Sequence, residues 1–116
     1  MVTLTMTDEQ AQIVSKACEF FVRVRIGQFQ EITFNLMRDR PLPDDFCRRK
    51  ESAEILLLEA RKYIYPELRG TGHSYGIGKF DDADAAYDVH QAIRHCFGGP
   101  EPYTNRTDFP SCKRTE

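Results

Sequence analysis

The chain has 116 residues, a length typical of one compact domain with its own hydrophobic core. Hydrophobic residues make up 41% of it and charged residues 29%, a composition that excludes a disordered or a membrane-spanning chain. Sixteen Lys and Arg against 18 Asp and Glu leave a net charge of −2, so neither general nucleic-acid binding nor imitation of DNA is expected.

The first residues, MVTLTMTDEQ, lack the basic and apolar regions of a signal peptide, and no apolar run approaches the roughly 18 residues of a membrane span. We therefore expect a cytoplasmic protein without membrane contact. Cys18, Cys47, Cys96 and Cys112 are irregularly spaced and match no zinc-binding pattern. We expect free thiols that pack as small buried hydrophobes, with no metal site and no disulfide.

The first predicted helix begins after Thr7. Thr7 and Gln10 form a capping-box pattern, and apolar residues recur at spacings of three and four from Val14 to Val24. Gly27 interrupts the pattern, which resumes at Phe29. We predict a helix over 8–37 that is kinked, split or closely packed at Gly27 and that ends before the prolines at 41 and 43.

The second predicted helix runs over 44–65, up to the residue before Pro66. Its centre, ILLL at 55–58, is apolar on almost every side, which is typical of a helix in the middle of a bundle. One neighbouring element is expected to contact Leu56, Ala60 and Ile64, and another to contact Ile55, Leu58 and Tyr65.

The third predicted helix covers 82–97. Asp81 or Asp82 is expected to cap its start, and Gly98-Gly99-Pro100 is expected to end it. The segment 101–116 has no helical periodicity and is predicted to be an extended or disordered tail that Tyr103 and Phe109 pin to the body.

No segment alternates as a β-strand does, so the predicted fold class is all-α: a small antiparallel bundle of three to four helices, with one helical domain over 1–100. A helix that is apolar all round leaves surface that so short a chain does not cover, and a homodimer is therefore expected. The predicted core comprises Val14, Cys18, Phe21, Val24, Phe29, Leu56, Leu57, Ala60, Ile64, Val89 and Ile93.

The stretch RGTGHSYGIGK, residues 69–79, holds four of the seven glycines together with three cationic or titratable side chains and no acid. It fails as a P-loop, because Gly72 and Gly78 are separated by five residues and Phe80 stands where Ser or Thr should bind Mg²⁺. It fails as a dinucleotide fingerprint because one residue is in excess and a helix precedes it.

Two interpretations of this stretch stay open: a plain connection between helices, and a binding loop for an anion or a partner, built from backbone N–H groups and cations. Asp81, Asp82 and Asp84 would oppose a phosphate at the start of the next helix. If the helices are antiparallel, side chains from Arg23 to Glu31 and from Glu59 to Lys62 lie near the loop, unless they only pair on the surface. The predicted ligand-binding residues are Arg25, Gln28, Arg69, His73, Ser74, Tyr75 and Lys79.

No catalytic constellation can be nominated from residue order. His90 and His95 are five apart and fall on different helix faces, so they cannot chelate a metal as an i, i+4 pair. We expect a protein that works by binding rather than by catalysis, without a cofactor.

Four stretches considered together, TDEQAQIVSKACEFFVRVRIGQFQEI, ESAEILLLEARKYIYPEL, GHSYGIGKF and ADAAYDVHQAIRH, resemble small proteins carried by bacteriophages, prophages and other mobile elements. The resemblance implies an accessory protein that counters host defence. Two mechanisms are consistent with it. One is a sponge that binds a nucleotide-like immune signal without turnover. The other is an inhibitor that blocks a host defence protein, such as a CRISPR nuclease, through a surface patch.

Overall fold

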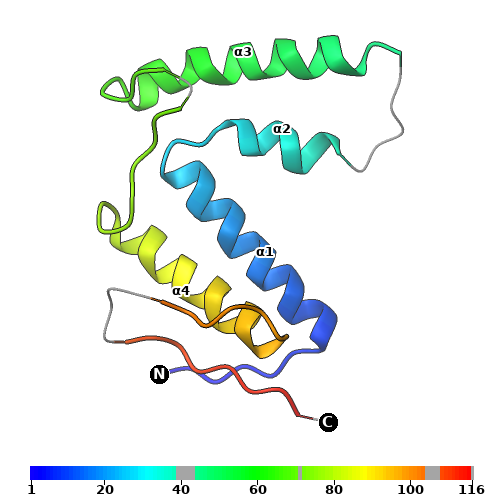
Figure 1. Cartoon of the computed structure of the whole chain (residues 1–116), viewed down its shortest axis with the longest axis vertical. Helices are drawn as coiled ribbons and strands as arrows, with labels where there is room; N and C mark the ends of the chain where they lie inside the picture. Colours follow the sequence, from blue (N-terminus) through cyan, green and yellow to red (C-terminus); the bar gives the residue numbers. More distant parts are fainter. Residues whose placement is uncertain (39–43, 71, 104–107, 116) are drawn as a thin grey trace. The chain divides into compact units, whose positions relative to one another are not determined.

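A computed structural model describes residues 1–38, 44–70, 72–103 and 108–115. The fold is all-α, as predicted: α1 (Asp8–Arg25), α2 (Gln30–Met37), α3 (Phe46–Ile64) and α4 (Asp81–Cys96) (Figure 1). The described residues contain no strand, and none of their helices is long and apolar enough to span a membrane. The prolines at 41 and 43 lie outside the described residues.

The chain divides into two compact units. Residues 1–22 and 77–116 form what we call the terminal unit, and residues 23–76 form the central unit. Each unit is a separate arrangement of helices, and each is described by itself below.

In the terminal unit, the first part of α1 packs against α4, which runs in the opposite direction (Figure 1). The predicted capping box starts α1: the Thr7 amide donates to Gln10 Oε1 (3.0 Å) and the Gln10 amide donates to Thr7 Oγ1 (3.1 Å). The terminal unit buries Val22, Ala83, Ala92 and Ile93 together with the polar Ser15, Asp88, His90 and Gln91.

The two ends of α4 differ in how well they were predicted. At its end, Gly98 adopts φ +87° and the Gly99 amide donates to the Arg94 carbonyl (2.9 Å), which is the predicted glycine cap. At its start, the predicted aspartate cap is wrong, because Phe80 precedes the helix without a side-chain cap bond. The Asp84 carboxylate instead accepts from the Gly78 amide (3.0 Å), one turn further out.

The described part of the tail is extended and attached to the terminal unit. Gln91, which is 1% exposed, donates from its amide to the Tyr103 carbonyl and accepts from the Tyr103 amide (2.9 Å). Further along, the Arg114 guanidinium lies 2.7 Å from the Asp8 carboxylate and over the Phe97 ring.

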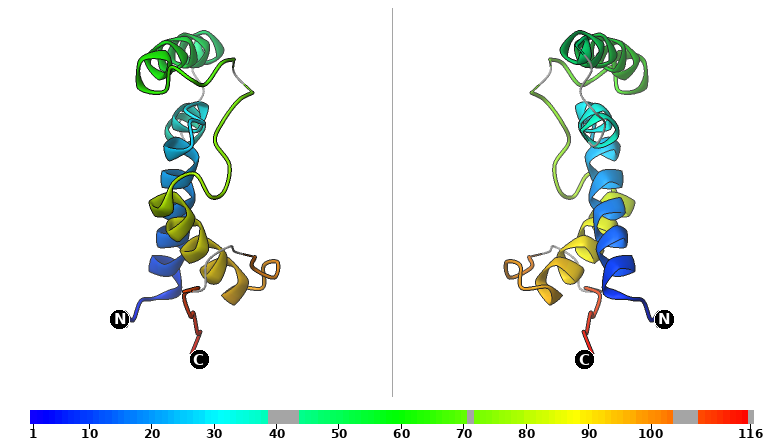
Figure 2. Two further views of the ribbon diagram at one scale, coloured as in Figure 1. Left: turned by 90° about the vertical axis from the view of Figure 1, so that its left-hand side faces the viewer. Right: turned by 90° about the vertical axis from the view of Figure 1, so that its right-hand side faces the viewer.

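In the central unit, α2 and α3 lie side by side and run in opposite directions (Figures 1 and 2). This unit buries Phe29, Thr33 and Arg61. Gly27 separates α1 from α2, which was one of the interpretations of the interrupted pattern. The second predicted helix is confirmed as α3 with its bounds shifted by one or two residues.

The predicted core is correct only in part. Phe29 and Ile93 are buried, and Val14, Cys18, Val24, Leu57 and Val89 are half-buried. Phe21, Leu56, Ala60 and Ile64 are exposed, Leu56 by 70%. Leu56 and Ala60 lie on the side of α3 that points away from α2, because the helix turns about 100° per residue and α2 covers the side of Leu57 and Arg61. Ile64 is exposed at the last residue of α3. The expectation that a neighbouring element contacts Leu56, Ala60 and Ile64 is therefore wrong.

The four cysteines are free, but the expectation that they are buried fails for Cys47, which is exposed. Cys18, Cys96 and Cys112 are half-buried. The Cys96 thiol donates to the Cys112 carbonyl (2.8 Å), so these two residues connect α4 with the tail.

Candidate functional site

The candidate site begins at the turn that ends α1. Gly27 adopts φ +100°, and the amides of Gly27 and Gln28 donate to the carbonyls of Val24 (3.0 Å) and Arg23 (2.8 Å). This is the Schellman pattern, in which glycine takes the left-handed position after a helix. A Cβ atom at position 27 would collide with Leu68 Cδ1, so glycine also lets the chain after α3 pack against this turn.

Arg61, in the last turn of α3, holds the segment that follows that helix. Arg61 is only 3% exposed, and its guanidinium donates to the backbone carbonyls of Gly27 (3.0 Å), His73 (2.9 Å) and Gly70. A buried cation is tolerated where hydrogen-bond acceptors surround it, and a guanidinium offers five N–H donors in a fixed plane. We call the segment so fixed, Arg69, Gly70 and residues 72–76, the Arg61-held loop.

Two tyrosines attach this loop to the end of α1. The Tyr75 amide donates to the Ile26 carbonyl (2.8 Å), and its ring meets the Tyr65 ring edge-on with centroids 5.4 Å apart. The Tyr65 hydroxyl accepts from the Arg25 guanidinium (2.7 Å) and donates to the Arg25 carbonyl (2.8 Å). The Tyr75 hydroxyl donates to Glu67. The loop is therefore positioned by both its backbone and its aromatic side chains.

The structure places six of the seven predicted site residues in the central unit. Arg25 and Tyr75 both contact Tyr65, and the Gln28 amide donates to the Ser74 hydroxyl (3.3 Å). Gln28 also accepts from Arg23 (3.3 Å), so a polar row leads from α1 to the loop. Arg69 and His73 belong to the loop and are exposed. Lys79 belongs to the terminal unit and is left out of the site.

Charge and hydrogen bonding favour the Arg69 end of the glycine-rich stretch over its Gly78 end as a place for an anion. Three cations, Arg23, Arg25 and Arg69, come from the end of α1 and the loop, and one acid, Glu67, is bonded to Tyr75. At the far end of the stretch, the Gly78 amide is already bonded to the Asp84 carboxylate. This agrees with the expectation that the acids of α4 oppose an anion there.

The outer charges of the central helices behave as ordinary surface pairs. Glu59 and Lys62 form an exposed pair on α3 (3.1 Å), and Glu31 accepts from the Asn35 amide one turn along α2 (3.4 Å). The expectation that polar groups of α1 and α3 lie near the loop therefore holds for Arg61, Arg23 and Gln28. It does not hold for Glu31, Glu59 and Lys62. The sequence could have indicated that Arg61 is buried, because it stands four residues after Leu57 and so lies on the same side of the helix.

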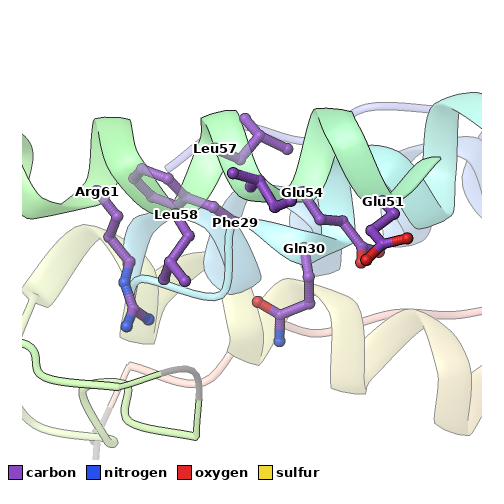
Figure 3. Close-up of a pocket in the computed structure, with 8 residues that line it drawn as sticks. Phe29, Gln30, Glu51, Glu54, Leu57, Leu58 and Arg61 are labelled. Atoms are coloured by element: carbon purple, nitrogen blue, oxygen red, sulfur yellow. The ribbon is translucent and has the colours of Figure 1, made fainter. Parts of the chain in front are cut away.

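The central unit also contains a groove that the sequence did not indicate (Figure 3). It has a volume of about 340 Å³, within the range of about 300–1,000 Å³ that is usual for ligand pockets. Its apolar part and its polar rim both come from α3 and the start of α2. The lining residues are Phe29, Gln30, Glu51, Glu54, Ile55, Leu57, Leu58 and Arg61.

In the terminal unit, Ser15, His90 and Glu19 form a cluster that has the composition of a nucleophile triad. His90 Nδ1 lies 2.8 Å from Ser15 Oγ and 3.1 Å from the Ser15 carbonyl oxygen, and its Nε2 lies 2.8 Å from Glu19 Oε2. The last contact is an ion-pair distance without hydrogen-bond alignment. His90 Nδ1 donates or accepts according to the tautomer of the ring, and the cluster joins α1 to α4.

Among the described residues, no group of three or more His, Cys, Asp and Glu is arranged to hold a metal ion. No family model, no curated protein and no solved structure matches the chain.

Proposed function

We propose that the protein binds a small anionic, nucleotide-like ligand at the Arg61-held loop and does not turn it over. The observation that supports this most is the clamp itself: Arg61 bonds three backbone carbonyls and so fixes a loop whose Arg69, His73 and Ser74 are exposed. A loop ordered before binding loses less entropy when its ligand arrives. Functional groups commonly gather on loops that a rigid scaffold positions.

Each exposed group supplies a contact of the kind that a phosphorylated ligand needs. The Arg69 guanidinium and the His73 ring donate to phosphate oxygens, and the Ser74 hydroxyl, already bonded to Gln28, can donate as well. The half-buried Tyr75 offers an aromatic surface beside them. The buried Arg61 is not among these contacts, because it is only 3% exposed and three of its five N–H donors are bonded to carbonyls.

The biological setting is part of the same proposal. The resemblance of the sequence to phage and mobile-element proteins supports a role in the cytoplasm of a bacterial host, where the protein would sequester an immune signal. Two copies associated as a homodimer would bring two such loops to one ligand.

Isothermal titration against a panel of cyclic and ADP-ribose-type nucleotides tests the proposal. At least one member is expected to bind, with affinity lost in Arg69→Ala and His73→Ala. Arg48→Ala, which removes an exposed cation in the first turn of α3, is the matched control and should leave affinity unchanged. If binding is unchanged after a neutral linker replaces Gly72–Tyr75, the loop only connects α3 to α4 and the proposal is wrong.

A second function, inhibition of a host defence protein, is favoured by a different observation. The face of α3 that points away from α2 exposes Leu56, Ala60 and Tyr63, and Tyr63 is 82% exposed. Contiguous exposed apolar side chains are typical of protein interaction surfaces. Capture of a defence effector from host lysate that is lost in Tyr63→Glu, together with no nucleotide binding, would assign this function instead.

A further inference from the structure

The groove between Phe29 and α3 is polarised along its length (Figure 3). Glu51 and Glu54 lie at one end and Arg61 at the other, with Phe29 and Leu58 between them. The guanidinium of Arg61 is buried and donates to the Gly27 carbonyl and to two carbonyls of the Arg61-held loop. The groove therefore has an apolar middle and one end whose charge is open to solvent.

That open charge is negative. Glu54 is paired with Lys50 (3.0 Å) and accepts from the Thr33 hydroxyl (3.1 Å). The hydrogen bond from Lys50 lowers the pKa of Glu54, so this carboxylate is ionised at neutral pH. Glu51 is exposed at the rim of the groove. Two carboxylates against one lysine leave one negative charge available to a cation from outside.

The length of the groove indicates the size of its occupant. Glu51 and Arg61 are ten residues apart on α3, which corresponds to roughly 15 Å along the helix axis. A volume of about 340 Å³ spread over that length fits a few side chains in a row. An amphipathic helix presents such a row from residues at i, i+4 and i+7.

We propose that this groove docks an amphipathic helix of a partner protein, whose apolar stripe enters between Phe29 and Leu58 and whose Lys or Arg at one end meets Glu51. Charge complementarity selects this occupant, because an acidic partner would meet an uncompensated carboxylate at the rim. The proposal is independent of the anion site at the Arg61-held loop.

Fluorescence anisotropy with the full chain tests the charge rule. The probe is a labelled 14-residue helical peptide with Leu at i, i+4 and i+7 and two Arg at one end, and a second peptide carries Glu in place of both Arg. The Arg peptide is expected to bind about tenfold more tightly than the Glu peptide. Glu51→Lys should reverse this order, and Ile55→Asp, at an exposed position on the rim, should weaken both peptides.

Glu59→Lys is the matched control, because it makes the same charge change on the exposed side of α3 outside the groove. It should keep the wild-type order of the two peptides. Equal binding of both peptides by the wild type, or a reversal by Glu59→Lys as strong as that by Glu51→Lys, would overturn the proposal. A dimer of the wild type that Ile55→Asp in the groove separates, and that Leu56→Glu on the other side of α3 does not, would assign the groove to a second copy and would also overturn it.

Discussion

Arg61 shows how one buried side chain orders a loop. Its guanidinium donors reach three carbonyls that belong to the turn after α1 and to the Arg61-held loop. Arg61→Ala should lower the free energy of unfolding by about 2–4 kcal/mol, because buried carbonyls lose their donors. Arg61→Lys should recover only part of the loss, since an ammonium cannot form the planar fork. Urea unfolding measures both, and Lys62→Ala, next in sequence and exposed, should stay within about 0.5 kcal/mol of the wild type.

Gly27 is required for two reasons that substitution can separate. Its φ of +100° disfavours any residue with a Cβ atom, and a Cβ atom there would also collide with Leu68. Gly27→Ala should therefore cost about 1–3 kcal/mol of stability. Gly70→Ala is the comparison, because Gly70 has φ +80° with open space around it and incurs only the backbone strain. Equal losses in the two variants would show that the contact with Leu68 is irrelevant.

The cysteines should differ in reactivity because burial differs. Burial raises the pKa of Cys18, and burial together with the nearby Cys96 raises the pKa of Cys112 to about 11. At pH 8 a raised pKa keeps the thiol protonated, and only the thiolate reacts. Iodoacetamide should therefore modify the exposed Cys47 first, with Cys112 reacting faster as the pH rises towards 11. Mass spectrometry of peptides from timed samples checks the order, and unfolding in urea should abolish the delay at Cys112.

At the scale of elements, Gln91 attaches the tail to α4 through hydrogen bonds. Both polar atoms of its side chain are bonded to the backbone of Tyr103, in a position that is 1% exposed. Gln91→Leu should leave those backbone groups without partners and release residues 101–103. Hydrogen exchange at the Tyr103 amide should then accelerate by about tenfold or more. Asp108→Ala, an exposed change further along the tail, serves as the control, and unchanged exchange in Gln91→Leu would contradict this role.

At the scale of the whole molecule, the exposed face of α3 bears on the expected homodimer. Leu56, Tyr63 and Ile64 are apolar and exposed in one copy, so pairing two such faces would remove them from water. Light scattering is expected to give twice the chain mass of 13.4 kDa at micromolar concentration. Leu56→Glu should return the mass to that of one chain, whereas Glu59→Gln should not. A wild type of 13.4 kDa would exclude this dimer.

The features that the sequence alone determined are those whose physics is local. The capping box of Thr7 and Gln10 and the glycine cap at Gly98 depend on residues within a few positions of one another, as does the helical period of each segment. These interactions are set by backbone geometry, so the all-α class and the helix bounds followed to within a few residues. The proximity of Gln28 to the glycine-rich stretch was a conjecture from the sequence, and the hydrogen bond from Gln28 to Ser74 brings the two together.

Only the tertiary structure decided which face of each helix is covered. The centre of α3, residues 55–58, is apolar on nearly every side, so its pattern could not distinguish the buried Arg61 side from the exposed side of Leu56 and Ala60. The pairing of Ser15 with His90 joins residues 75 positions apart, and the groove beside Phe29 exists only where α2 meets α3. Burial depends on the neighbour that a helix acquires in space, and nothing in the sequence of an isolated helix specifies that neighbour.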